Sequence, residues 1–453
     1  MKMNARSLPP RIFPIFAAAL LATATALAIS GCASGSSNPL ASIQAAQVKN
    51  AGNFTTTVFL GDSLTAGYQS GSLLDTQQVH GWANLVATQA AFNISLPLIA
   101  PPGAPNVLQL VTVHPLVITT APGITTGRDN FATQATDLAV PGATLNDILN
   151  TVPLIVPTSG QQQINQLVLG YPGLGYGQAY SQTTFALKAN PTTIFLWAGN
   201  NDALVADISG MPSSMTPLAT FTTQYQALIT ELTTMTSAHL VIANIPDVTL
   251  VPYLQPASVV LAQASAASGL PTTTLSAVLG ISPGDLVNPT GTAQVAAILT
   301  GAQKGPITDA GFLSAAEVAT VKAQVTAYNQ VISQQAASVG ATLVDINALF
   351  SKVATSGVTI SGFTGTSTFL GGVFSLDGIH PTNTGYAVIA NTFIDTMNAQ
   401  IKTSVPDVNL ATVAAADPLW PVNLAHHADL PANARTIPAN AGRSLDILFN
   451  HPQ

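Results

Sequence analysis

A serine and an Asp-x-x-His pair are the residues of this sequence whose types and spacing could together do chemistry. Ser63 follows the apolar run 56–60 in "TTTVFLGDSLTAGY", and Asp377 and His380 lie three residues apart in "SLDGIHPTNTGY". A serine hydroxyl attacks a carbonyl only when a base removes its proton and donors stabilise the oxyanion. An aspartate on the same tight turn can hydrogen-bond one histidine ring nitrogen and leave the other free as the base. These residue types therefore indicate nucleophilic attack on a carbonyl carbon.

Two further segments could supply the donors that such a reaction needs. Gly142 in "DLAVPGATL" follows a predicted strand, where its backbone N–H could face a developing negative charge. Asn201 in "LWAGNNDAL" follows another predicted strand and offers a side-chain amide. Taken singly, each feature also has a plainer explanation, because glycine, asparagine and aspartate commonly end strands in turns. An isolated Asp-x-x-His pair is weak support for catalysis, so the interpretation depends on all these residues meeting at one place.

The segments that must bring them together are typical of a parallel sheet. Short β-branched apolar runs indicate buried strands, and helix-like segments separate them along the chain. This alternation predicts a doubly wound α/β sandwich, in which ligands bind beyond the carboxyl ends of the strands. The serine, the glycine and the asparagine would then share one rim of the sheet. The expected strands are 56–60, 136–140, 192–198, 239–245 and 341–346.

The clearest predicted helix covers residues 314–339. Apolar residues recur through it at helical spacing, Ser314 and Glu317 form a capping box at its start, and a glycine follows its end. Residues 219–237 and 384–401 show a similar pattern. These helices are expected to cover the sheet.

Three stretches do not fit the alternation of strands and helices. Residues 98–131 and 253–312 are too long for ordinary connections, so we expect insertions near the rim of the sheet. Residues 403–453 contain several prolines and little periodicity, which predicts an extended C-terminal tail.

The balance of charge argues against nucleic acid as a partner. Only 7% of the residues are charged, against roughly 25% in an average soluble protein, and the formal net charge is −7. The basic residues before Cys32 are Lys2, Arg6 and Arg11, with no acidic residue among them, so the remainder of the chain is more acidic still. No cluster of lysine or arginine remains to bind a phosphate backbone.

The N-terminus predicts export. A basic region from Lys2 to Arg11 precedes the apolar stretch 12–30, which is the layout of a secretory signal. The stretch leads into "ISGC", where Cys32, the sole cysteine, resembles the lipidated residue of a bacterial lipobox. Two alternatives stay open: ordinary cleavage after "ALA" at 26–28, giving a periplasmic or secreted soluble protein, and an uncleaved membrane-spanning helix. The expected location is the bacterial cell envelope, with a lipid anchor to a membrane through Cys32.

Taken together, the motifs resemble the four sequence blocks of the GDSL, or SGNH, serine hydrolases. In the family's order these are Gly61-Asp62-Ser63-Leu64, Gly142, Gly199-Asn200-Asn201-Asp202 and Asp377-x-x-His380, spread over about residues 54–400. The resemblance implies that Ser63 is the nucleophile, His380 the general base and Asp377 the residue that orients it. It also implies an oxyanion hole formed by Ser63, Gly142 and Asn201.

The resemblance implies the SGNH hydrolase fold, a three-layer α/β/α sandwich that is flavodoxin-like and has a five-stranded parallel sheet. The expected domains are a lipoprotein-type signal peptide (1–31), a tether (32–52), the hydrolase domain (53–402) with its two insertions, and the tail (403–453). One departure is visible: Asp137 stands where family members often carry asparagine. Because a carboxylate cannot donate an amide hydrogen bond, the bracing of that loop is expected to differ.

The predicted function is that of a serine esterase or lipase, which hydrolyses small-molecule or lipid esters through an acyl-enzyme without a cofactor or metal ion. A carbohydrate O-acetylesterase or an acyltransferase could use the same site, and the apolar content of 258–299 favours acyl chains over glycans. A non-catalytic surface-binding lipoprotein is the alternative of another class, although such a protein is expected to lose one of its catalytic residues. The "AHHAD" run at 425–429 could suggest a metal site, but adjacent histidines rarely share one ion.

Overall fold

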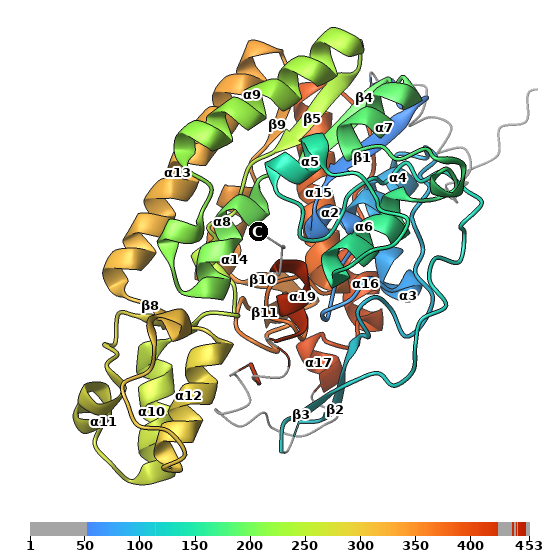
Figure 1. Ribbon diagram of the computed structural model, residues 1–453. Coiled ribbons are helices and arrows are strands. Elements are labelled where there is room, and N and C mark those ends of the chain that lie inside the picture. The colour runs from blue at the N-terminus through green and yellow to red at the C-terminus, as the bar shows by residue number, and fades with distance from the viewer. Residues whose placement is uncertain (1–51, 114, 425–436, 439–440, 442, 450–453) are drawn as a thin grey trace, which may run out of the picture. The chain divides into compact units, whose positions relative to one another are not determined.

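A parallel sheet with helices around it forms the framework of the fold (Figure 1). The chain is described here by a computed structural model, which covers residues 52–113, 115–424, 437–438, 441 and 443–449, all within the unit Ile43–Gln453. The sheet has the strand order β1-β4-β5-β9 and confirms four of the five expected strands. These strands are β1 (Thr57–Gly61), β4 (Thr193–Trp197), β5 (His239–Ala243) and β9 (Thr342–Val344).

The fifth expected strand, 136–140, does not form. This segment runs beside β1 and exchanges two backbone hydrogen bonds of 2.9 Å with Phe59, which gives a single parallel bridge between Phe59 and Asp137. At the next position the Gly61 N–H donates to Gln182 Oε1 at 3.0 Å, while the Gly61 carbonyl accepts both Gln182 Nε2 at 2.9 Å and the Val140 N–H at 3.2 Å. The side-chain amide of Gln182 thus replaces one backbone hydrogen bond of the ladder, and the sheet has four strands in place of the expected five.

Helices cover both faces of this sheet. The connections β1 to β4, β4 to β5 and β5 to β9 all step in the same direction, so right-handed crossovers place α7, α9 and α13 on one face. The other face is covered by α4 and α15, where Trp82 stacks on Phe393 with ring centroids 3.9 Å apart. The helices are α4 (Trp82–Gln89), α7 (Gln182–Ala189), α9 (Leu218–Met235), α13 (Ala315–Ser338) and α15 (Asn383–Gln400).

The three helices predicted from the sequence are confirmed. In α13 the Ser314 side chain accepts the Glu317 N–H and the Glu317 side chain accepts the Ser314 N–H, which is the predicted capping box. Phe221 of α9 stacks on Tyr328 of α13 with ring centroids 3.9 Å apart, so the two longest predicted helices pack against each other.

The two stretches expected to be insertions each form small structures of their own. Residues 98–131 contain an antiparallel pair, β2 (Leu108–Thr112) and β3 (Val117–Thr120). Residues 253–312 contain three helices that share a separate buried apolar cluster. They are α10 (Ala257–Ser268), α11 (Thr272–Leu279) and α12 (Pro289–Leu299), accompanied by the short strands β6 (Gln255–Pro256), β7 (Leu286–Val287) and β8 (Phe312–Leu313).

The described residues of the C-terminal part form short helices, whereas the sequence predicted an extended tail. They include α16 (Leu410–Ala416), α17 (Pro421–Leu424) and α19 (Asp446–Phe449). Seven of the described apolar side chains in this part belong to the main core, and the last four of them recur at the helical spacing of four, four and three residues. These four are Ile437, Ala441, Leu445 and Leu448.

The remaining elements connect or flank the ones above. They are α2 (Ser63–Ala66), α3 (Asp75–Gln78), α5 (Leu145–Asn150), α6 (Gly160–Leu169), α8 (Asn200–Ser209), α14 (Ile346–Ser356), β10 (Val358–Ile360) and β11 (Phe363–Gly365).

Candidate active site

Ser63 lies directly beyond the carboxyl end of β1. The strand ends at Gly61, where an added Cβ would lie 2.5 Å from the carbonyl oxygen of Trp197, so the close approach of β1 and β4 requires a glycine there. The next residue but one, Ser63, is the first residue of the one-turn helix α2 and is 3% exposed. The apolar run of β1 therefore delivers the serine to the rim of the sheet.

Asp62 ties this turn to the end of the neighbouring strand. Its Oδ1 accepts the Leu64 N–H at 3.1 Å, and its Oδ2 accepts a hydrogen bond of 2.9 Å from Asn200 Nδ2. Burial raises the pKa of Asp62 to about 6, although these two hydrogen bonds and the charge of His380 act in the opposite direction.

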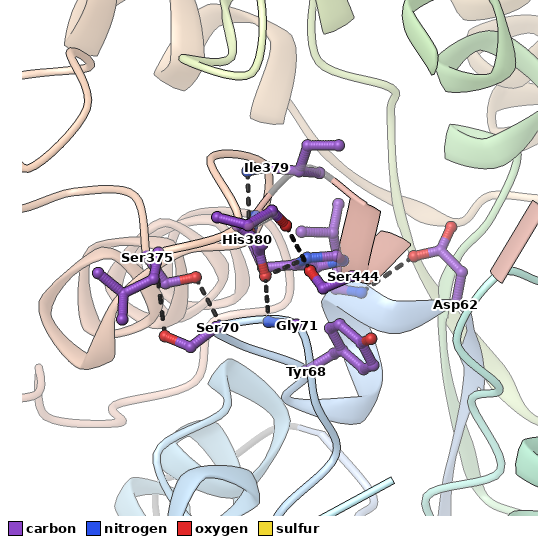
Figure 2. Close-up of polar contacts among 12 residues, drawn as sticks. Asp62, Tyr68, Ser70, Gly71, Ser375, Ile379, His380 and Ser444 are labelled. Atoms are coloured by element: carbon purple, nitrogen blue, oxygen red, sulfur yellow. Dashed lines mark hydrogen bonds and ion pairs between the residues drawn. The ribbon is translucent and has the colours of Figure 1, made fainter. Parts of the chain in front are cut away.

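Asp377 and His380 form a buried hydrogen-bonded pair (Figure 2). His380 Nδ1 lies 3.0 Å from Asp377 Oδ2, and the backbone N–H groups of Ile379 and His380 each donate to Asp377 Oδ1 at 2.9 Å. Burial alone would raise the pKa of Asp377, but the charge of His380 and these hydrogen bonds outweigh it and hold the pKa below its usual value. The carboxylate is therefore ionised at neutral pH and fixes the imidazole ring.

The second ring nitrogen of His380 is free to act. Among the described residues, Nε2 is buried and has no hydrogen-bond partner. The ring of Tyr68 lies beside the imidazole, with centroids 4.6 Å apart. When Nδ1–H donates to Asp377, the neutral imidazole carries its lone pair on Nε2. This is the arrangement that a general base requires.

The loop after α2 supports this pair, and the sequence analysis missed it. The Gly71 N–H donates to Asp377 Oδ2 at 2.7 Å, and the Ser70 N–H donates to Ser375 Oγ at 2.8 Å (Figure 2). The loop that follows Ser63 thus anchors the turn that carries His380, more than 300 residues away along the chain. The small and polar residues from Gln69 to Ser72 were the only local signal of this role.

The two expected oxyanion donors meet beside the end of β1. Asn201 Nδ2 donates one of its two hydrogens to the Ala143 carbonyl at 2.9 Å, which leaves the other for a ligand. Gly142 has a left-handed φ of 81°, so the loop turns sharply at this residue. Gln161 Nε2 holds the loop by donating to the Pro141 carbonyl at 2.6 Å. The structure thus brings the Gly142 and Asn201 segments together.

Two cavities adjoin these segments. One, of about 350 Å³, is lined by Ala143, Gln161 and Gln182 among others. The other, of about 610 Å³, is lined by Ser70, Leu376 and residues of β2. The first lies next to the Gly142 loop and the second next to the loop that anchors Asp377.

Asp137, the departure from the family pattern, is a buried carboxyl with incomplete hydrogen bonding. Its Oδ1 accepts the Ala139 N–H at 3.2 Å, whereas its Oδ2 has no partner among the described residues. Burial raises the pKa of Asp137 to about 8, and the single hydrogen bond lowers it only in part. The carboxyl group is therefore protonated in the folded protein at neutral pH.

This raised pKa predicts a dependence of stability on pH. The unfolded chain loses the proton near pH 3.8 and the folded chain near pH 8, so stability is full below pH 3.8 and is lost as pH rises through 8. Asp137→Asn is expected to reduce the loss of unfolding free energy between pH 5 and pH 9 by up to about 4 kcal/mol, because about three pH units separate pH 5 from the native pKa, and to leave kcat unchanged. Urea unfolding at the two pH values measures this. The control is the exposed Asp309→Asn, and an unaltered pH dependence in Asp137→Asn would contradict the prediction.

Among the described residues no group of three or more His, Cys, Asp or Glu side chains is gathered as a metal site. The "AHHAD" run at 425–429 lies outside those residues.

Residues 57–393 match the family model described as GDSL-like Lipase/Acylhydrolase. No curated protein matches the chain. Among solved structures, an acetylxylan esterase from Geobacillus stearothermophilus is 12% identical, with a TM-score of 0.35 and 78% of this chain and 98% of that chain covered. A lipase/acylhydrolase from Enterococcus faecalis is 13% identical, with a TM-score of 0.33 and coverage of 78% and 100%. Phospholipase A1 from Streptomyces albidoflavus is 14% identical, with a TM-score of 0.33 and coverage of 77% and 100%.

Proposed function

The chain belongs to the GDSL-like lipase/acylhydrolase family, and on that premise we propose that it is a serine esterase acting through an acyl-enzyme on Ser63. The observation that carries the proposal is the buried Asp377–His380 pair, whose Nε2 has no partner among the described residues. Ser63 stands at the rim of the same sheet, at the end of β1.

The proposed first half-reaction forms the acyl-enzyme. Ser63 Oγ attacks the ester carbonyl carbon while His380 Nε2 takes the hydroxyl proton. Asp377 stabilises the imidazolium that results and holds the ring in the required tautomer. The backbone N–H groups of Ser63 and Gly142 and the Asn201 side-chain amide stabilise the oxyanion of the tetrahedral intermediate. His380 then gives the proton to the departing alkoxide as the carbon–oxygen bond of the ester breaks.

The second half-reaction returns the enzyme to its starting state. Water attacks the acyl carbon and gives one proton to His380 Nε2, and the same donors stabilise the second tetrahedral intermediate. As the bond between the acyl carbon and Ser63 Oγ breaks, His380 returns the proton to the serine. The carboxylic acid is released.

Hydrolysis of p-nitrophenyl esters from acetate to palmitate by the full-length protein tests this proposal. We expect turnover that is lost when Ser63 is replaced, as argued in the Discussion. A folded protein that hydrolyses none of the esters would overturn the esterase proposal. Transfer of the acyl group to a glycan acceptor without release of acid would overturn it as well, and would indicate an acyltransferase.

We also propose that the protein is held in the bacterial cell envelope by a lipid on Cys32. Support comes from the sequence alone, since the leader and Cys32 lie outside the described residues. Within the described part of the chain, no helix combines the length and apolarity that crossing a membrane requires. Fractionation of cells that express the wild type or Cys32→Ala tests the anchor. We expect the wild type in the membrane fraction and Cys32→Ala in the soluble fraction. The same distribution of both proteins between the two fractions would contradict the anchor.

A further inference from the structure

The described part of the C-terminal segment, residues 437–438, 441 and 443–449, contacts loops of the candidate active site. Ile437, Leu445 and Leu448 are each no more than 1% exposed and belong to the same buried cluster as the sheet. Asp446, between the two leucines, is exposed. α19 packs against α6, the helix that supplies Gln161 to the Gly142 loop (Figure 1). The segment therefore directs its apolar side toward the site and its charged side outward.

Three of its residues contact glycines of the site. A Cβ added to Gly378, the residue after Asp377, would lie 2.0 Å from Ile437 Cδ1. A Cβ added to Gly71, whose N–H donates to Asp377, would lie 2.6 Å from Ser444 Oγ. Figure 2 shows Ser444 among the residues around His380.

The third contact is made at the proposed oxyanion hole. A Cβ added to Gly142 would lie 2.7 Å from the carbonyl oxygen of Leu448. An ester bound for attack would place its own carbonyl oxygen near the Gly142 N–H. The backbone of α19 therefore borders the space that the reacting group needs.

The side chains proposed to take part in the reaction are almost fully buried. Ser63 is 3%, His380 1% and Asn201 3% exposed. An ester must reach Ser63 Oγ and His380 Nε2 simultaneously, and its leaving group must depart. The C-terminal segment contacts three of the loops around these residues, at Gly71, Gly142 and Gly378, so it is placed to restrict the entry of an ester.

We propose that the described C-terminal residues, 437–438, 441 and 443–449, form a plug that inhibits this chain's own active site, and that the substrates are esters whose apolar acyl chains displace it. The proposal rests on the esterase function proposed above. The surface beneath the plug accepts isoleucine and leucine side chains, so an alkyl chain can replace them without exposing that surface to water. An acetyl group is too small to do so. Short esters are therefore turned over only by the small fraction of molecules in which the plug is open.

Leucine-to-serine variants of the full-length protein test the plug. Leu445→Ser and Leu448→Ser each remove apolar contacts that hold the plug against the site, so more molecules have the plug open. We therefore expect kcat/KM for p-nitrophenyl acetate to rise about 10-fold or more. The gain in kcat/KM should shrink as the acyl chain lengthens towards decanoate, because a long acyl chain displaces the plug even in the wild-type protein. The control is Val408→Ser, a buried aliphatic residue after α15 that makes none of the contacts above; it should show no gain. Equal kcat/KM for acetate in wild type and variants would overturn the plug, and a gain independent of chain length would overturn the acyl-chain assignment.

A second measurement uses the wild type and does not depend on the folding of variants. A p-nitrophenyl alkylphosphonate gives up p-nitrophenolate as Ser63 Oγ bonds to phosphorus, which leaves an alkyl group in the site. Hydrogen exchange of the Leu445 and Leu448 amides should be about 10-fold or more faster with an octyl than with a methyl phosphonate. Equal exchange rates would overturn the plug.

The two proposals fail in different ways. Ester turnover that survives Ser63→Ala in the Leu448→Ser background would overturn the serine mechanism. Ester turnover that requires Ser63 but is unchanged by Leu445→Ser and Leu448→Ser would overturn only the plug proposal.

Discussion

Replacing Ser63 with alanine is expected to lower kcat for p-nitrophenyl ester hydrolysis by about 10⁴-fold or more. The variant keeps the Asp377–His380 pair and the oxyanion donors but has no atom that can form the acyl-enzyme. Residual turnover then comes only from binding and from stabilisation of the oxyanion during attack by water. Steady-state kinetics on the same ester series measure the loss, and a burst of p-nitrophenol seen in wild type should be absent.

Folding of Ser63→Ala is not expected to change. Alanine favours a helix at least as well as serine, and the change removes one oxygen from a small side chain. The melting temperature by circular dichroism should stay within a few degrees of wild type. The control is Ser351→Ala, an exposed serine on α14, which should retain full activity. A Ser63→Ala protein with more than a tenth of wild-type kcat would exclude Ser63 as the nucleophile.

Local sequence signals predicted those parts of the fold that neighbouring residues determine. The capping box of Ser314 and Glu317 located the start of α13 because both of its hydrogen bonds lie within four residues. The β-branched runs located β1, β4, β5 and β9 because strands that are largely buried on both faces consist of near-continuous apolar residues. Asp377 and His380 were found for the same reason, since their hydrogen bond spans a single turn.

The features that the sequence did not predict depend on distant residues. The segment 136–140 has the composition of a strand, but the amide of Gln182, 121 residues from Gly61, accepts the Gly61 N–H that this strand would otherwise bind. The loop at Ser70 and Gly71 anchors Asp377 across more than 300 residues. No periodicity within either segment could reveal such a partner.

The C-terminal segment is an intermediate case. Ile437, Ala441, Leu445 and Leu448 repeat at helical spacing, so a buried face was visible in the sequence. What that face covers was not visible, because the contacting glycines at 71, 142 and 378 come from three separate parts of the chain. A sequence can thus indicate that a segment is buried without indicating where.

Asp377→Asn is expected to lower kcat by about 10³- to 10⁴-fold, through the tautomer of His380. In the variant, the asparagine Oδ1 can still accept hydrogen bonds from the backbone N–H groups of Ile379 and His380. Its Nδ2 then takes the position of the Asp377 Oδ2 atom and donates a hydrogen bond towards His380 Nδ1. The imidazole must then accept at Nδ1 and carry its proton on Nε2, where the base is needed. Kinetics on p-nitrophenyl butyrate from pH 5 to pH 9 should show the loss at every pH.

The same substitution should also change stability, because the Gly71 N–H now meets a donor where Asp377 Oδ2 had accepted at 2.7 Å. We expect the unfolding free energy to fall by about 1 to 3 kcal/mol at pH 7. The lowered pKa of Asp377 stabilises the wild type above pH 3.8, and this contribution is lost as pH falls through the native pKa, so the difference between the proteins should narrow in acid. Asp395→Asn, an exposed change of equal charge on α15, is the control and should alter neither kcat nor stability. A folded Asp377→Asn protein with kcat within 10-fold of wild type would mean that His380 does not depend on Asp377 for its tautomer.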